Sequence, residues 1–272
     1  MNRAGARTDA GRTGVAVDDW EAHWSSFSAA AERNPAQAFR RRLVLALLAA
    51  HGPPERYLDI GSGQGDLAVA VADRWPDAEI AGIELSRNGV DIATRKLPQA
   101  RFRQFDLLSG EPPRAGFQGW ATQATCSEVL EHVDEPETLL ASARRWLAPG
   151  ALLVVTVPGG PISAFDRHIG HRRHYTTTEL SSLLTSAGFD VLGSGGAGFP
   201  FFNLYRRTVI ARGDRLVADV DAAQGVSLPA RTAMAVFDRL LAASPTRGRR
   251  GWQLYGVARL RHSGHGGRHG RR

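Results

Sequence analysis

The sequence contains one cysteine, Cys126, and one lysine, Lys96, among its 272 residues. A single cysteine excludes an internal disulfide. The longest apolar runs, such as 43–50, are far shorter than the roughly 20 residues that a bilayer crossing needs. The opening residues, MNRAGARTDAGRTG, also lack the apolar centre of a secretory signal. We therefore expect a cytoplasmic protein with no membrane span.

The net charge of +7 and the isoelectric point near 10.5 come mostly from the two ends of the chain. Residues 1–17 and 261–272 together hold six of the seven net positive charges, so residues 18–260 are close to neutral. Basic ends of this kind are typical of solvated, disordered tails, which we expect at 1–17 and 262–272. The charge pattern does not favour nucleic acid as the partner, and an RNA-directed function stays as the alternative.

From residue 55 onward, short apolar segments alternate with helical patterns. Strands are expected at 55–60, 78–85, 100–108, 120–126, 151–157, 189–195 and 252–260, and helices at 66–75, 86–97, 136–147 and 178–187. This alternation predicts an α/β fold with a parallel sheet covered by helices on both faces. Ligands of such sheets bind at the carboxyl ends of the strands.

The regions outside this alternation have a helical pattern. Residues 18–50 predict two helices separated at Asn34-Pro35, which form an N-terminal lid on a main domain at 51–261. The segment 199–248 predicts a helical cap inserted before the last strand.

The stretch YLDIGSGQGDL places Gly61, Gly63 and Gly65 between the first strand and the first helix of the alternation. Glycines at this point let backbone N–H groups approach a ligand closely. The G-x-G-x-x-G spacing of a dinucleotide site is absent, because Asp66 stands at the sixth position. Asp59 would repel a pyrophosphate and suits a cationic ligand. These residues favour a sulfonium cofactor over NAD and disfavour an oxidoreductase.

Two further acids follow the next two strands. Glu84 is expected to accept hydrogen bonds from a ribose diol, and Asp106 from an adenine amino group. Together with the glycine loop, they resemble the S-adenosyl-L-methionine site of the class I methyltransferases. The resemblance covers about residues 55–160 and the final strand. It implies a Rossmann-like three-layer sandwich whose mostly parallel, seven-stranded sheet has an antiparallel last strand.

The resemblance also implies a set of residues that contact S-adenosyl-L-methionine, and these lie in the glycine loop or at strand ends. They are Asp59, Gly61, Ser62, Gly63, Gly65, Glu84, Leu85, Asp106, Leu107 and Ser127.

The stretch CSEVLEHV follows the fourth strand and contains Glu128, Glu131 and His132. If it is helical, all three side chains share one face. Two carboxylates and an imidazole suit Mg²⁺, Mn²⁺ or Zn²⁺. The E-x-x-E-H spacing is similar to that of the ubiquinone-pathway O-methyltransferases and the small-RNA 3′-end 2′-O-methyltransferases. That similarity implies His171 as a further metal ligand.

A metal-free pocket is the other interpretation of the same residues, with His132 or His171 as the catalytic base. In either case the resemblance implies methyl transfer to a small-molecule acceptor, at oxygen first and nitrogen second, in secondary metabolism. The residues expected to contact this acceptor are Trp20, Trp24, Arg172, Tyr175 and Phe201. An RNA-directed 2′-O-methyltransferase remains the alternative.

Overall fold

The computed structural model describes residues 34–221 and 228–262. The strands are β1 (Arg56–Ile60), β2 (Glu79–Glu84), β3 (Arg101–Gln104), β4 (Ala121–Ser127), β5 (Leu147–Pro158), β6 (Phe189–Ala197) and β7 (Gln253–Leu260). They form one 7-stranded sheet in the order β3-β2-β1-β4-β5-β7-β6. The pairs from β3 to β5 are parallel, and β7 is antiparallel to both of its neighbours. The predicted mostly parallel sheet with an antiparallel last strand is confirmed.

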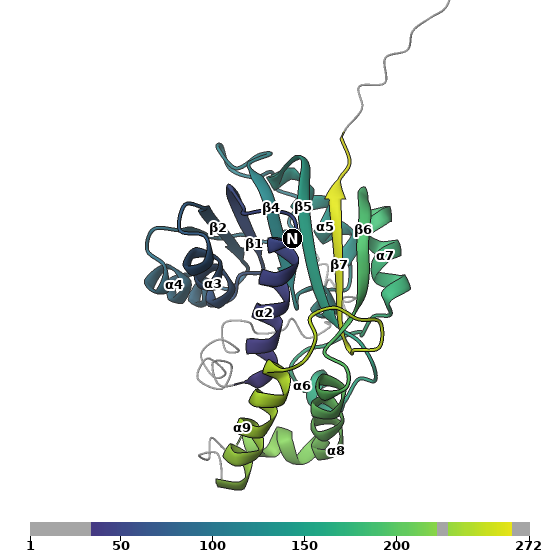
Figure 1. Cartoon of the computed structure of the whole chain (residues 1–272). Helices are drawn as coiled ribbons and strands as arrows, with labels where there is room; N and C mark the ends of the chain where they lie inside the picture. Colours follow the sequence, from purple (N-terminus) through teal and green to yellow (C-terminus); the bar gives the residue numbers. More distant parts are fainter. Residues whose placement is uncertain (1–33, 222–227, 263–272) are drawn as a thin grey trace, which may run out of the picture.

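Helices cover both faces of the sheet (Figure 1). They are α2 (Pro35–Ala49), α3 (Asp66–Arg74), α4 (Arg87–Lys96), α5 (Pro136–Ala143), α6 (Ala164–His168), α7 (Thr177–Ser186), α8 (Phe201–Asp221) and α9 (Leu228–Ala242), with short 3-10 turns η1 (Leu130–His132) and η2 (Arg144–Trp146). Helices α2, α3 and α4 lie on one face, and α5 and α7 lie on the other. Within the described residues, no helix combines the length and hydropathy of a membrane span. The predicted three-layer α/β sandwich is confirmed.

Two helices begin where local capping chemistry places them. Asn34 accepts a hydrogen bond from the Ala36 amide at 2.9 Å, and Pro35 occupies the first turn of α2. Ser86 accepts from the Gly89 amide at 3.1 Å and begins α4, as the sequence predicted. Side-chain oxygens at these positions satisfy amides that the first helical turn leaves unpaired.

Three boundaries differ from the prediction by four residues, more than the others do. The helix expected at 136–147 ends at Ala143 and is followed by η2, so β5 begins at Leu147 rather than 151. Strand β3 is shorter than 100–108, because Asp106 accepts a hydrogen bond from the Leu108 amide at 2.8 Å and begins a turn.

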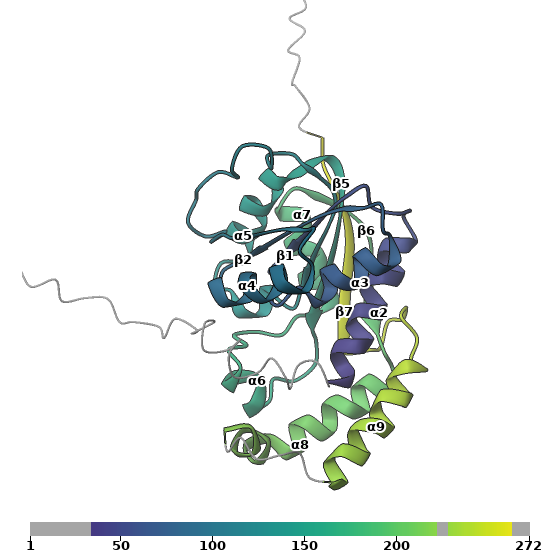
Figure 2. The same ribbon diagram turned by 90° about the vertical axis from the view of Figure 1, so that its left-hand side faces the viewer.

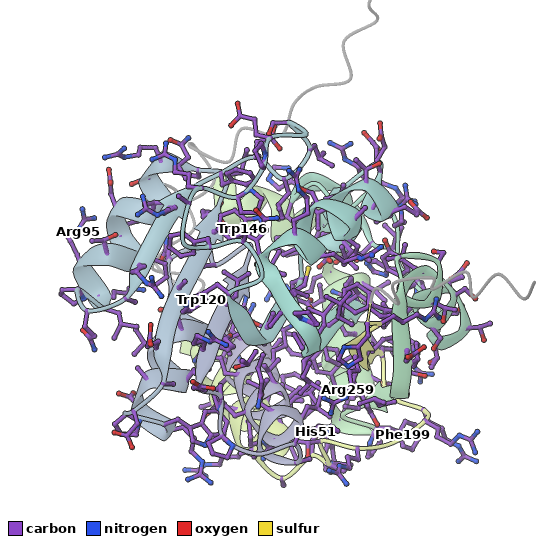
Figure 3. All side chains as sticks on the ribbon, turned by 90° about the horizontal axis from the view of Figure 1, so that it is seen from above. His51, Arg95, Trp120, Trp146, Phe199 and Arg259 are labelled. Carbon is purple, nitrogen blue, oxygen red and sulfur yellow. The ribbon has the colours of Figure 1, made fainter. Side chains whose placement is uncertain are left out.

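Two buried clusters fill the space between the layers. The cluster on the α2 side includes Phe39, Leu43 and Tyr57. The cluster on the α5 side includes the buried residues Trp146 and Trp120, both labelled in Figure 3. Apolar packing on both faces explains why the buried part of β5, in the middle of the sheet, is almost entirely apolar.

The insertion before β7 forms the hairpin of α8 and α9, which lies beyond the carboxyl ends of the parallel strands (Figure 2). It packs against α2, where the rings of Phe39 and Phe202 are 5.4 Å apart. Arg42 of α2 donates to the carbonyls of Leu241 and Ser244 at 2.6 and 2.7 Å, at the end of α9. The predicted helical insertion is therefore confirmed. Its contacts with α2 hold it against the N-terminal helix of the described residues.

Candidate active site

The glycine loop joins β1 to α3 at the carboxyl edge of the sheet. Gly61, Gly63 and Gly65 have left-handed backbones, with φ of 69°, 51° and 79°, which glycine adopts without steric cost. The Gly61 amide donates to the Ile83 carbonyl of β2 at 2.9 Å. A Cβ on Gly61 would collide with the Val129 side chain. The loop is therefore held between β2 and the segment that follows β4.

Glu84, at the end of β2, is fixed by the backbone around it. Its Oε2 accepts from the Gly63 amide at 2.8 Å, and its Oε1 accepts from the Ser86 amide at 3.0 Å. Both carboxylate oxygens of Glu84 are therefore held in place at the carboxyl end of β2. The nearby Ser62 hydroxyl is buried and has no hydrogen-bond partner among the described residues.

Asp59, at the end of β1, is buried in a short hydrogen-bond chain. Thr125 Oγ1 donates to Asp59 Oδ1 at 2.8 Å and lies 2.6 Å from the hydroxyl of Tyr57. Burial, together with the charge of Glu84, raises the pKa of Asp59 to about 7, although the Thr125 hydrogen bond lowers it. A cation placed beside this carboxyl would restore its charged form.

The remaining residues expected to contact the cofactor lie at the ends of three strands. Asp106 is exposed after β3, and Leu85 is 46% exposed after β2, whereas Leu107 is buried. Ser127 ends β4, where its hydroxyl is 2.8 Å from the Thr156 hydroxyl. All of these positions follow the carboxyl ends of parallel strands, where the glycine loop also lies.

Glu128 does not lie on the expected helix face. It has a left-handed backbone with φ of 57°, so the helical turn after β4 begins only at Leu130. Its Oε2 is 3.0 Å from Arg40 Nη2, and its Oε1 accepts from Gln253 Nε2 at 2.8 Å. The helical geometry expected for 128–132 is thus not formed, and Glu128 is outside both residue groups that have metal-site geometry. The guanidinium of Arg40 balances the negative charge of Glu128 instead.

Glu131, His132 and His171 do come together. Their potential ligand atoms all lie within 4.8 Å of one another, and the His132 and His171 rings meet edge to face with centroids 4.7 Å apart. Glu131 is 0% exposed, and neither carboxyl oxygen has a hydrogen-bond partner among the described residues. Burial, followed by the charge of Glu128, raises the pKa of Glu131 well above its usual value. A buried carboxyl without a partner is costly unless a ligand satisfies it.

A second group shares His171 and contains Asp166 and His174. Asp166 is the acid of a capping box with Ser163 at the start of α6, and its Oδ2 lies 2.6 Å from Arg206 Nη2 of α8. Burial raises the pKa of Asp166, but the hydrogen bond and charge of Arg206 outweigh it and lower the pKa to about 2. The guanidinium therefore already supplies the positive charge that a metal ion would bring to this group.

Burial favours the neutral forms of His171 and His174. Burial, followed by the neighbouring His132, lowers the pKa of His171 to about 2. Burial also lowers the pKa of His174. A nitrogen with so low a proton affinity is a weak base near neutral pH but stays available as a metal ligand.

Three of the five residues expected to contact the acceptor lie in the described part of the chain. Arg172 pairs with Asp134, and its amide donates to the Glu131 carbonyl at 2.8 Å. Tyr175 is buried, and its hydroxyl donates to the Leu130 carbonyl at 3.0 Å, so it supports η1. Phe201 begins α8. The predictions for Trp20 and Trp24 fall outside the described residues.

Sequence reasoning missed four polar residues around this site. Asp166 had a local signal, the S-x-x-D pattern of a capping box. Arg40, Arg206 and Gln253 had none, because each lies in a helix or strand far along the chain from its partner. Only the fold brings them to the site.

Curated relatives match part of the chain. A ubiquinone biosynthesis O-methyltransferase of Thiobacillus denitrificans is 34% identical over 97 residues, which is 35% of this chain and 41% of the relative. A trans-aconitate 2-methyltransferase of Methylobacterium nodulans is 31% identical over 142 residues, 52% of this chain and 50% of the relative. The chain thus matches half or less of the length of each of these two relatives.

The fold also has solved counterparts. A TehB-like SAM-dependent methyltransferase of Corynebacterium glutamicum superposes with a TM-score of 0.52 at 15% identity, covering 88% of this chain and 98% of the counterpart. The model of the methyltransferase domain family matches residues 31–193, which is more than half of the chain. This protein therefore belongs to the methyltransferase domain family.

Proposed function

We propose that the protein transfers a methyl group from S-adenosyl-L-methionine to a hydroxyl of a small-molecule acceptor. The observation behind this proposal is the group of Glu131, His132 and His171 beside the glycine loop, which Val129 contacts directly at Gly61. Methyl transfer needs the acceptor atom aligned about 3 Å from the methyl carbon in a site that excludes water. The group of Glu131, His132 and His171, next to the glycine loop, would align an acceptor atom in this way.

Asp59, Glu84 and the glycine loop are the proposed cofactor contacts. The Asp59 carboxyl would face the cationic methionine part of the cofactor, and its raised pKa would fall when that positive charge binds. Glu84 is already oriented by two backbone amides and would accept from the ribose hydroxyls. Asp106, exposed at the next strand end, would lie on the adenine side.

The residues also fit a divalent metal ion. Glu131 would offer a carboxylate oxygen that has no other hydrogen-bond partner in the described part of the chain, and His132 and His171 would each offer a ring nitrogen. When bound, such an ion would lower the pKa of the acceptor hydroxyl by direct coordination. The low pKa of His171 argues against its role as a general base and for its role as a ligand. His132 is the remaining candidate base if no metal is used.

Oxygen as the acceptor atom is supported by the names of the relatives, one of which is an O-methyltransferase of ubiquinone biosynthesis. Nitrogen is the second choice, and a role in secondary metabolism is part of the proposal. The RNA-directed alternative rests on the basic tails, which lie almost wholly outside the described residues.

Calorimetric titration with S-adenosyl-L-methionine tests the cofactor. Asp59→Asn and Glu84→Gln should each weaken binding by about 10-fold or more, since each removes a charged hydrogen-bond partner. Glu79→Gln, at the exposed start of the same strand β2, is the matched control and should bind normally. Absence of binding by the native protein, or unchanged affinity in both site variants, would overturn the proposal.

Turnover of catechol acceptors with labelled methyl donor tests the reaction, and metal analysis with chelator treatment tests the ion. Loss of activity in excess chelator and its return with Mg²⁺ or Mn²⁺ is the expected result. Full activity in chelator, with no bound ion, would leave the methyltransferase proposal in place and remove the metal from it.

A further inference from the structure

The loop before α7 contains two histidines joined by a hydrogen bond. Nδ1 of His171 lies 3.1 Å from Nε2 of His174. On its other side, Nδ1 of His174 lies 2.9 Å from the carbonyl oxygen of Gly160. The Gly160 carbonyl, His174 and His171 therefore form a continuous chain of hydrogen bonds. It starts at the backbone just after β5 and ends at the proposed reaction site.

The chemistry of the last partner fixes the direction of this chain. A carbonyl oxygen only accepts hydrogen bonds, so His174 Nδ1 must have the proton. A neutral imidazole has one N–H, which leaves Nε2 of His174 as an acceptor. His171 must then donate to it through Nδ1–H. This tautomer is assigned from hydrogen-bond partners, which is the ordinary basis for such assignments.

Asp166 does not compete for these protons. Its oxygens lie 4.0 Å from His171 Nδ1 and 3.9 Å from His174 Nε2, beyond hydrogen-bond distance. Its Oδ2 already accepts from the Ser163 amide at 2.7 Å and from Arg206 at 2.6 Å. The acid therefore stabilises the loop without deciding which histidine nitrogen is protonated.

The Gly160 carbonyl is a firm anchor for the chain. Gly160 has a left-handed backbone with φ of 74°, and a Cβ at this position would lie 2.7 Å from the Trp252 ring. The Cα of Gly160 therefore packs against the indole of Trp252, just before β7, and a larger residue does not fit. The carbonyl that meets His174 Nδ1 thus belongs to a tightly packed residue.

We propose that His174 is a positioning residue that holds His171 as its Nδ1–H tautomer, so that His171 Nε2 has the lone pair available at the Glu131–His132 site. A lone pair on Nε2 is what either a metal ion or an acceptor hydroxyl requires of this ring. The consequence for turnover rests on the proposed function, whereas the tautomer itself does not.

Nitrogen NMR of protein labelled with ¹⁵N only in histidine tests the tautomer directly, at pH 8 in chelator-treated protein without cofactor. In the native protein, His171 should show a protonated Nδ1 and an unprotonated Nε2, assigned by the signals that disappear in His171→Asn. His174→Gln should keep this pattern, because its amide oxygen also accepts. His174→Phe should lose it. His168→Gln, at an exposed histidine that ends α6, is the matched control and should change nothing.

Activity and Mn²⁺ affinity provide the second measurement. His174→Phe should lose about 10- to 100-fold in either quantity, the usual effect of removing a partner that orients a ligand, and His174→Gln should regain most of it. A protonated Nε2 on native His171, or an unchanged His171 pattern in His174→Phe, overturns the inference even in an active methyltransferase. Absence of cofactor binding overturns the proposed function and leaves the NMR result valid.

Discussion

Arg40 of α2 and Glu128, the left-handed residue after β4, form an ion pair with an Nη2 to Oε2 distance of 3.0 Å. Gln253 of β7 closes the arrangement, since it accepts from Arg40 Nε and donates to Glu128, both at 2.8 Å. Three segments far apart in sequence therefore meet around one carboxylate. This triad positions the backbone that leads directly into Glu131 and His132.

Replacing Arg40 with methionine should destabilise the protein, because the Glu128 side chain is only 15% exposed and would lose its counter-charge. We expect a loss of about 1–3 kcal/mol in the free energy of unfolding, measured with urea. Arg87→Met, which breaks the exposed Arg87–Asp91 pair within α4, is the control and should cost about 0.5 kcal/mol or less. Equal losses in the two variants would show that the triad adds nothing specific.

Asp59 should make the protein less stable as the pH rises. Its pKa in the folded protein is about 7 rather than 3.8, so the folded state binds the proton more tightly than the unfolded chain. The free energy of unfolding should therefore fall between about pH 4 and pH 7, by a total on the order of 4 kcal/mol.

Asp59→Asn keeps an oxygen that accepts from Thr125 and should remove this slope. The variant should be more stable than the native protein above pH 7 and similar to it near pH 4, when urea midpoints are compared across that range. Asp77→Asn, at an exposed position before β2, should follow the native curve. A native curve that is flat over the same interval would contradict the expected proton uptake.

Glu131→Leu should change stability and function in opposite directions. In chelator-treated protein, leucine removes a fully buried carboxyl without a described partner, so we expect a gain of about 1–3 kcal/mol. The same variant should lose Mn²⁺ binding and methyl transfer. Glu137→Leu, on the exposed first turn of α5, should be neutral in both measurements. A clear loss of stability in Glu131→Leu would mean that the carboxyl is satisfied in the metal-free protein.

Gly61→Ala should lower the free energy of unfolding for two separable reasons. The left-handed backbone costs an L-residue about 1–2 kcal/mol, and the collision with Val129 adds about 1–3 kcal/mol of overpacking. Gly110→Ala isolates the first cost, because Gly110 has φ of 76° and nothing within 4 Å of its Cβ position.

In a double-mutant cycle, Val129→Ala should restore the stability that the collision removes from Gly61→Ala. It should restore none of the stability that Gly110→Ala loses. Urea unfolding of the single and double variants supplies all the required values. Strictly additive effects of Gly61→Ala and Val129→Ala would rule out the contact between the glycine loop and the segment after β4.

Local sequence patterns were sufficient to predict much of the fold. The alternation of apolar strands and helical segments predicted the parallel sheet, and Ser86 predicted the start of α4. The glycine loop, Glu84 and Asp106 were placed at strand ends, because parallel strands end at one edge. The least accurate boundaries lie where Asp106 begins a turn after β3 and where a 3-10 turn separates α5 from β5.

The sequence by itself determined the class of fold and the edge of the sheet at which the polar residues gather, because periodicity and strand ends are local properties. The tertiary structure decided which of three carboxylates at the site have a partner. Glu128 is compensated by Arg40, and Asp166 by Arg206, whereas Glu131 is buried among groups that leave both its oxygens unsatisfied within the described residues. Burial and charge compensation depend on residues distant along the chain, so no local pattern could distinguish these acids.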